Sequence, residues 1–119
     1  MSKTDNTLVV CTAGKHRSPT TKRLLKDNHD IIARCAGIHK QAEAQVTQEM
    51  IDWADYIIAM DERIDGHKSY LEEHFSLGET PVYVFDIPDQ FEKEDPELIS
   101  LLEDKLAVFV DRITNAKQN

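Results

Sequence analysis

The fold is decided by residues 7–21, TLVVCTAGKHRSPTT. Residues 8–10 are a short apolar run of the kind that forms a strand buried on both faces, and the run ends at Cys11. Ser18 is a good N-cap, and Pro19 suits the first position of a helix. We therefore predict a strand, a tight loop and a helix, with a thiol at the end of the strand and the Arg17 guanidinium at the far side of the loop.

This loop is suited to binding phosphate. A loop that closes onto a helix N-terminus directs several backbone N–H groups into one space, where the helix end carries about half a positive charge. Arg17 adds a fork of donors that matches two phosphate oxygens. Such a space also stabilises a thiolate at Cys11, to which the Ser18 hydroxyl could donate a hydrogen bond. We predict that Cys11 and Arg17 are catalytic and that phosphate is bound by Thr12, Ala13, Gly14, Lys15, His16, Arg17 and Ser18.

Each of these residues alone has a plainer interpretation. A single Cys at a strand end is usually a small buried hydrophobe, and a single Arg before a helix is usually solvated. Their combination, with five residues between them and Ser18 directly after, is much more specific. The P-loop of nucleotide hydrolases is excluded, because Gly14-Lys15 is followed by His16 and not by Ser or Thr.

Length and composition limit the remaining possibilities. The 119 residues are enough for one domain, residues 1–119, and the net charge of −8 argues against a general role on nucleic acid or membrane surfaces. No apolar run approaches the about 20 residues of a membrane span, and the polar start MSKTDNT lacks the apolar core of a signal peptide. The two cysteines do not form a CxxC pair, so we expect a reducing cytoplasm. We also expect a monomer.

Apolar segments alternate with helical patterns along the rest of the chain. We predict strands over residues 31–36, 56–59 and 82–85, and helices over residues 19–28, 42–54, 67–74 and from Pro96 onward. This alternation predicts an α/β fold with a four-stranded parallel sheet and helices on both faces, a flavodoxin-like or Rossmann-like three-layer arrangement. Ligands bind such sheets at the carboxyl ends of the strands, where Cys11 lies.

Two further patterns concern the last helix and the histidines. The last helix has an apolar stripe, which Leu101 broadens, made by Leu98, Leu102, Leu106, Phe109 and Ile113. The histidines show no metal-ligand spacing, so we predict no metal. Apart from His16 on the loop, we predict that all of them lie at the surface: His29, His39, His67 and His74.

The sequence from Cys11 to Pro19 resembles the low-molecular-weight protein tyrosine phosphatases, whose pattern is a strand, Cys, five residues, Arg, Ser and Pro. Residues 35–37 (CAG), 54–61 (ADYIIAMD) and 86–91 (DIPDQF) are similar to other segments of that family, so the resemblance covers nearly the whole chain. It implies a phosphomonoester hydrolase, most simply a protein tyrosine phosphatase that works through a cysteinyl-phosphate intermediate without a cofactor. Its substrate would be a phosphorylated protein or a small phosphate ester.

The resemblance also implies a general acid on the loop after the fourth strand. In the family this acid is the Asp of an Asp-Pro-Tyr loop, and Asp89-Gln90-Phe91 matches it by the spacing to the aromatic residue. Asp86 follows the strand directly, as the acid does in some members. We favour Asp89 and keep Asp86 as the alternative.

Cys35 stands where the family has a Ser beside the loop, and His16 stands where the family often has a second Cys. If the first two strands are adjacent and parallel, Cys35 comes within disulfide reach of Cys11 and could capture its oxidised form. The alternative is a buried, inert Cys35. Two other functions also remain possible, namely an arsenate reductase-like thiol enzyme and a catalytically weak phosphate-binding module.

Overall fold

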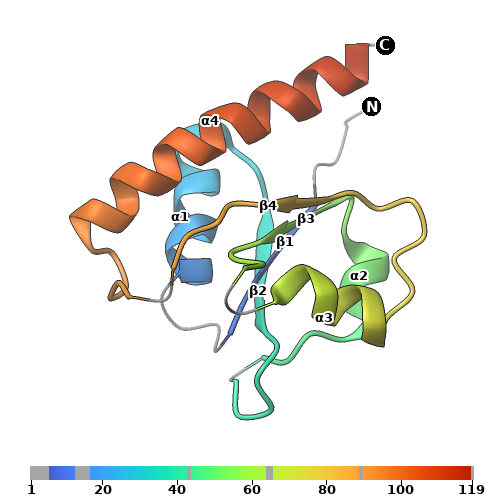
Figure 1. The fold of residues 1–119 in the computed structure, drawn as a ribbon. Coiled ribbons are helices and arrows are strands. Elements are labelled where there is room, and N and C mark those ends of the chain that lie inside the picture. Colours follow the sequence, from blue (N-terminus) through green and yellow to red (C-terminus); the bar gives the residue numbers. More distant parts are fainter. Residues whose placement is uncertain (1–5, 13–16, 43, 64–65, 89, 119) are drawn as a thin grey trace.

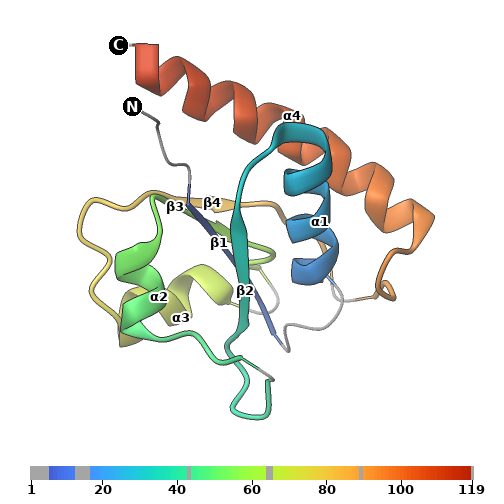
Figure 2. The same ribbon diagram turned by 180° about the vertical axis from the view of Figure 1, so that it is seen from behind.

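The architecture is a parallel sheet between two layers of helices. The structure is a computed structural model that describes residues 6–12, 17–42, 44–63, 66–88 and 90–118. Its four strands are all parallel and lie in the order β2-β1-β3-β4. Figures 1 and 2 show α1 and α4 on one face of the sheet and α2 and α3 on the other, which confirms the predicted fold class. The elements are β1 (Thr7–Cys11), α1 (Arg17–His29), β2 (Ala33–Gly37), α2 (Gln48–Trp53), β3 (Tyr56–Ala59), α3 (His67–His74), β4 (Val82–Val84) and α4 (Pro96–Gln118).

The strand β1 is central and is buried on both faces, as its apolar run predicts. Successive side chains of a strand point to opposite faces. Leu8 and Val10 therefore pack in the core under α2 and α3, whereas Val9 and Cys11 pack in the core under α1 and α4. This alternation delivers the Cys11 thiol to the side of the sheet on which α1 begins.

The apolar stripe of α4 is confirmed, and its predicted broadening is wrong. All five residues of the stripe are buried, whereas Leu101 is 38% exposed. A helix turns by about 100° per residue, so Leu101 is rotated away from its buried neighbour Leu102 toward solvent. The stripe is thus narrow, and it covers only the face of α4 that meets the sheet and α1.

The helix α2 is shorter than the predicted helix over residues 42–54. The Thr47 hydroxyl caps it by accepting a hydrogen bond from the Met50 N–H at 3.2 Å. The preceding residues bond to the end of β2 instead, since the Gly37 N–H donates to the Ala44 carbonyl at 2.8 Å and the Val46 N–H donates to the Gly37 carbonyl at 3.1 Å. These tertiary bonds use the backbone groups that a longer helix would need.

Three other predicted boundaries are shifted. The helix α1 begins at Arg17, so Ser18 lies inside the helix and is not its N-cap. The strand β2 begins at Ala33, because Asp30 has φ 55° and the Ile31 N–H turns back to the Leu25 carbonyl at 3.1 Å. The strand β4 stops one residue early, at Val84. Within the part of the chain that the structure describes, no helix is both long and apolar enough to cross a membrane.

Candidate active site

The end of β1 places Cys11 against the first turn of α1. Cys11 is only 2% exposed, and its Sγ lies 3.1 Å from the Oγ of the fully buried Ser18. The predicted contact between the two side chains is therefore present, although Ser18 makes it from within the helix. A hydroxyl that donates to a thiolate favours the charged form of the sulfur.

The guanidinium of Arg17 is buried next to this pair. Arg17 is the first residue of α1 and is 1% exposed. Its Nη1 donates to the Ile87 carbonyl at 2.7 Å, and its Nη2 donates to the Thr12 hydroxyl at 3.4 Å. A buried charge is costly unless hydrogen bonds satisfy it, and these two bonds also fix the plane of the guanidinium. They tie the loop after β1 to the loop after β4.

A buried histidine supports the same loop, and the prediction that His67 lies at the surface is wrong. His67 is fully buried, and its Nδ1 accepts the Asp61 backbone N–H at 3.0 Å. The other ring nitrogen, Nε2, therefore carries the proton and donates to the Thr12 hydroxyl at 3.0 Å. Hydrogen bonds thus run from the end of β3 through His67 and Thr12 to Arg17. The only clue in the sequence is that His67 opens a helix soon after a strand that ends at the same sheet edge as Cys11.

Part of the predicted phosphate-binding set is described and the rest is not. The structure brings Thr12, Arg17 and Ser18 together around Cys11, and their role in phosphate binding stays a prediction. The segment after β2 also bonds to the start of the loop. The Ile38 N–H donates to the Cys11 carbonyl at 3.0 Å, and the His39 N–H donates to the Thr12 carbonyl at 2.9 Å. The other predicted members lie outside the described residues: Ala13, Gly14, Lys15 and His16. In the described ranges, no group of three or more His, Cys, Asp or Glu side chains is placed to hold a metal ion.

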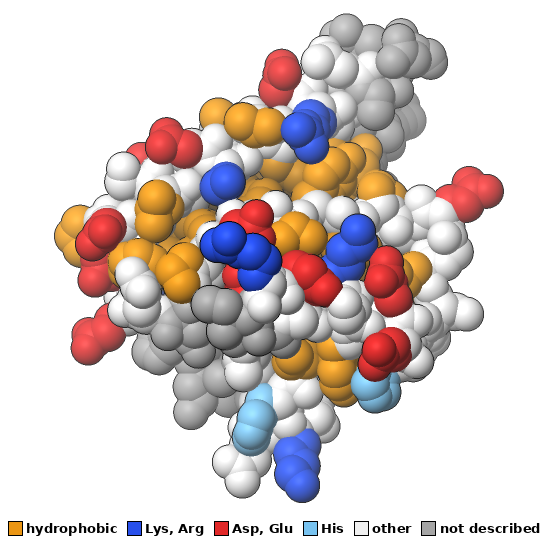
Figure 3. All heavy atoms as spheres, in the orientation of Figure 1, with side chains coloured by type: hydrophobic (Ala, Val, Ile, Leu, Met, Phe, Trp, Pro, Cys, Tyr) orange, Lys and Arg blue, Asp and Glu red, His pale blue; other side chains and the backbone are white. Residues whose placement is uncertain are grey.

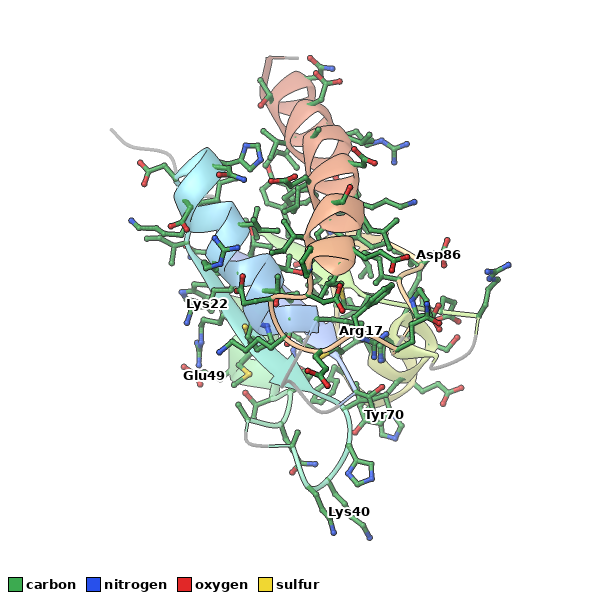
Figure 4. The ribbon with its side chains drawn as sticks, turned by 90° about the vertical axis from the view of Figure 1, so that its left-hand side faces the viewer. Arg17, Lys22, Lys40, Glu49, Tyr70 and Asp86 are labelled. Carbon is green, nitrogen blue, oxygen red and sulfur yellow. The ribbon has the colours of Figure 1, made fainter. Side chains whose placement is uncertain are left out.

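The loop after β4 carries both candidate general acids. Its backbone reaches the site, since the Ile87 N–H donates to the Met60 carbonyl at 2.8 Å while the Ile87 carbonyl accepts from Arg17. Asp86 has φ 58° and an exposed side chain, and Figure 4 shows it turned outward, away from Arg17. Asp89 lies outside the described residues. The loop is therefore beside the site, but Asp86 does not point into it.

The segment that follows this loop is fastened to α1. The Thr20 hydroxyl accepts the Glu94 N–H at 3.0 Å, and the Arg23 guanidinium binds the Glu94 carboxylate with Nη2–Oε1 at 2.7 Å. Arg23 also pairs with Asp27. The hydrogen bond between Arg23 and Glu94 raises the pKa of Arg23 and lowers the pKa of Glu94. The two side chains are 42% and 35% exposed, so solvent screens the pair, which positions the segment and adds little stability.

Cys35 lies close to the site but is not placed to form the predicted disulfide. In the register of β1 and β2, Cys11 pairs with Gly37, and Cys35 pairs with Val9. The two cysteines therefore lie on neighbouring strands and are offset by two residues along them. This places their Cα atoms about 8 Å apart, which exceeds the limit of about 7 Å for a disulfide. Burial raises the pKa of the Cys35 thiol, against the opposing effects of a Ser18 hydrogen bond and the Lys22 charge. These observations favour the alternative, an inert Cys35.

Comparison with known proteins finds the same fold in solved structures, phosphatases among them. No protein-family model matches the sequence, and no curated protein matches it significantly. Solved structures do match. A low molecular weight phosphotyrosine phosphatase from Vibrio cholerae O395 is 19% identical, with a TM-score of 0.70 over 92% of this chain and 96% of that one. The YwlE arginine phosphatase from Geobacillus stearothermophilus is 25% identical, with a TM-score of 0.65 over 95% and 92%.

A thioredoxin-dependent arsenate reductase from Corynebacterium glutamicum is also similar, at 16% identity, with a TM-score of 0.68 over 97% of this chain and 64% of that one. The parallel sheet between two layers of helices is thus an α/β architecture that the chain shares with these solved structures. More particularly, the chain has the fold of the low-molecular-weight protein tyrosine phosphatases. The resemblance that the sequence predicts is confirmed.

Proposed function

We propose that this protein is a cysteine-dependent phosphomonoester hydrolase, a protein tyrosine phosphatase of the low-molecular-weight type. The observation that carries the proposal is the placement of the Cys11 thiol 3.1 Å from the Ser18 hydroxyl, beside the buried Arg17. Two structures with the same fold are named phosphatases, one for phosphotyrosine and one for arginine. The two free cysteines suit a reducing cytoplasm, and we propose this location and a monomer as well.

In the proposed reaction, the Cys11 thiolate attacks the phosphorus atom of the ester. The S–P bond forms as the P–O bond to the leaving group breaks, and an aspartic acid gives its proton to the leaving oxygen. Arg17 and the backbone N–H groups of the loop stabilise the charge on the three remaining oxygens. A water molecule, deprotonated by the same aspartate, then attacks the cysteinyl phosphate and releases inorganic phosphate and the thiolate.

We propose Asp89 as that general acid, with Asp86 as the alternative. The proposal is supported by Ile87, which lies between the two candidates in the sequence and whose carbonyl accepts a hydrogen bond from Arg17. The outward orientation of Asp86 favours Asp89. Proton transfer to the leaving group by such a residue contributes about 10²–10⁴-fold to the rate.

The two other candidate functions have less support. Arsenate reduction needs a further thiol that can reach the catalytic one, and the strand register holds Cys35 out of disulfide reach of Cys11. An external thiol would have to serve instead. A weak phosphate-binding module would keep Arg17 and the loop but would not turn over a substrate.

The test is hydrolysis of a chromogenic aryl phosphate, followed by a panel of phosphotyrosine peptides, phosphoarginine and small alkyl phosphates. We expect turnover without added metal or thiol, and mass spectrometry after an acid quench should find phosphate on the peptide that contains Cys11. Cys11→Ser should abolish turnover while it still binds vanadate, and Cys35→Ser, the matched control, should retain it. Substantial turnover by Cys11→Ser would contradict the covalent mechanism. Binding of phosphate without turnover in the wild type would identify a phosphate-binding module.

A further inference from the structure

A groove runs along the outer edge of β2, beside α1, and does not belong to the site described above. Its first part is a cavity of about 530 Å³ lined by α1, by Cys35 of β2, by Ala44 and by Lys93. A second cavity of about 310 Å³ shares Lys22 and Lys26 with the first and continues to residues 31–33. Figure 2 shows β2 at the edge of the sheet with α1 next to it.

The groove is positively charged, although the protein as a whole has a net charge of −8. Among the described residues, four cations and one carboxylate line its larger cavity. The carboxylate, Asp27, and the nearby Glu94 are both paired with Arg23. Lys26 is held loosely, with its Nζ 3.5 Å from an Asp30 carboxylate that is 90% exposed. Lys22 and Lys26 are therefore the cations that a ligand could recruit at little cost.

The strand edge on this side presents backbone groups as well as charge. In a parallel pair, alternate residues direct their N–H and C=O groups to opposite sides of the strand. Ile32 directs its carbonyl inward to β1, and Gly37 directs its N–H outward to Ala44 at 2.8 Å. The backbones of Ala33 and Cys35 have the same parity as Gly37 and are directed outward too, but Ala33 is only 5% exposed, so the half-buried Cys35 is the residue that offers its backbone to a ligand. An edge of this kind can pair with an added extended chain.

The groove leads to the catalytic loop. Pro19, which lies two residues after Arg17, lines one end. Ser18 links the two regions, since its Oγ lies 3.1 Å from the Cys11 sulfur and its hydroxyl acts to lower the pKa of the Cys35 thiol. Figure 4 shows Lys22 on the side of α1 that is turned away from Arg17. The opposite end of the groove reaches Ile32, whose side chain is 64% exposed.

We propose that this groove binds an extended, acidic peptide segment next to the phosphorylated residue of a protein substrate, a proposal that rests on the function proposed above. The segment pairs with the edge of β2 through the outward backbone groups of Cys35. Its acidic side chains lie on Lys22 and Lys26, and an apolar side chain covers Ile32. At about 3.3 Å per residue, some five residues span the strand.

The first experiment compares phosphopeptides that carry acidic residues on one side of the phosphorylated residue with peptides that carry the matching amides. Wild-type enzyme should have the higher kcat/KM for one of the acidic peptides. In the double variant Lys22→Glu/Lys26→Glu this preference should fall about 2- to 30-fold, the range expected for two exposed ion pairs. The aryl phosphate assay on the same variant detects any loss of fold or chemistry.

The control variant is Lys105→Glu, which lies in a second groove of about 380 Å³ that β4 and α4 form at the opposite edge of the sheet. Figure 3 shows the face of the molecule that is seen in Figure 1, and on this face Lys and Arg side chains are mixed with hydrophobic and acidic ones. Lys105→Glu should leave the acidic preference unchanged. A preference that disappears in Lys105→Glu and survives in the double variant would overturn the proposal.

The second experiment measures binding without catalysis, so that it remains decisive if the chain hydrolyses no phosphate ester. An unphosphorylated acidic peptide should bind wild-type protein and bind the double variant more weakly. Two further peptides are N-methylated at alternate amides, one at the odd-numbered and one at the even-numbered positions. Only one of them should bind more weakly, because only one set of peptide N–H groups faces β2. Equal binding by wild type and double variant would refute the groove, whereas absence of hydrolysis with intact peptide binding would refute the enzymatic function alone.

Discussion

Replacement of the buried His67 tests whether the site depends on support from β3 and α3. In His67→Phe the ring is similar in size, but the described hydrogen bonds of the imidazole, to the Asp61 N–H and to Thr12, are lost. The Asp61 N–H, on a residue that is 3% exposed, would lose the acceptor Nδ1, and an unsatisfied buried donor costs about 1–3 kcal/mol. The bond to Thr12 is partly buried and contributes about 0.5–1.5 kcal/mol. We therefore expect the free energy of unfolding to fall by about 2–4 kcal/mol.

Urea unfolding of His67→Phe measures this loss, and His74→Phe is the matched control. His74 lies in the same helix, is exposed and stacks on Tyr70 with ring centroids 4.1 Å apart, an arrangement that Phe can keep. The control should change stability by less than about 0.5 kcal/mol. His67→Gln, which can both accept and donate, should recover part of the loss. The reasoning fails if His67→Phe has the same urea midpoint and slope as the wild type.

The network also predicts a catalytic effect in conditions where the variant remains folded. Thr12 accepts from both His67 and Arg17, so loss of His67 should loosen the guanidinium. A small displacement of a positioning group can cost about 10²-fold in rate. We expect His67→Phe and Thr12→Val to lower kcat on an aryl phosphate, with a coupling energy of about 0.5–3 kcal/mol in a double-mutant cycle. Independent, additive effects would show that the two residues do not act together.

Three further predictions concern the acid, the segment bound to α1 and the second thiol. Asp89→Asn should remove the alkaline limb of the pH–rate profile and slow hydrolysis of an ester with a poor leaving group by about 10²–10⁴-fold. If Asp86→Asn has this effect instead, the two roles are reversed. Glu94→Gln should lower the free energy of unfolding by no more than about 1 kcal/mol, with a loss that shrinks at high salt, because its pair with Arg23 is exposed. The Cys35 thiol has a raised pKa in the folded state, so the stability it contributes is complete below the unfolded thiol pKa of about 8.5 and is lost as pH rises above it. Urea titrations above that pH should therefore show a smaller loss of unfolding free energy in Cys35→Ser than in the wild type. If the free energy of unfolding falls with pH at the same rate in both proteins, the assignment is contradicted.

The parts of the fold that were predicted well depend on local pattern. A run of apolar residues predicted β1, and a narrow stripe of apolar residues with helical spacing predicted α4. The helix α3 was predicted with its observed bounds, His67–His74. In each case the signal lies within the segment itself, so no knowledge of neighbouring elements is needed.

The parts that were predicted poorly depend on contacts between distant segments. Residues 42–46 carry a helical pattern, but bonds to Gly37 keep them out of α2. In the sequence, nothing distinguishes His67 from an ordinary surface histidine. Its burial depends on contacts with the residue after β3 and with the loop after β1. The distance between Cys11 and Cys35 depends on a strand register that differs by two residues from the pairing a disulfide requires. Pairing partners of this kind cannot be read from local periodicity.

The hydrogen bonds around Arg17 have a consequence for the site as a whole. Both described bonds of the guanidinium go to neutral acceptors, a backbone carbonyl and a hydroxyl. These two bonds orient the guanidinium, and neither of them brings a negative charge to it. Since one acceptor comes from the loop after β4 and the other is held by His67, the geometry of the cation is set by β3, β4 and α3 together. A loop fixed in this way needs little reorganisation when a substrate binds, which is the condition under which such groups stabilise a transition state most strongly.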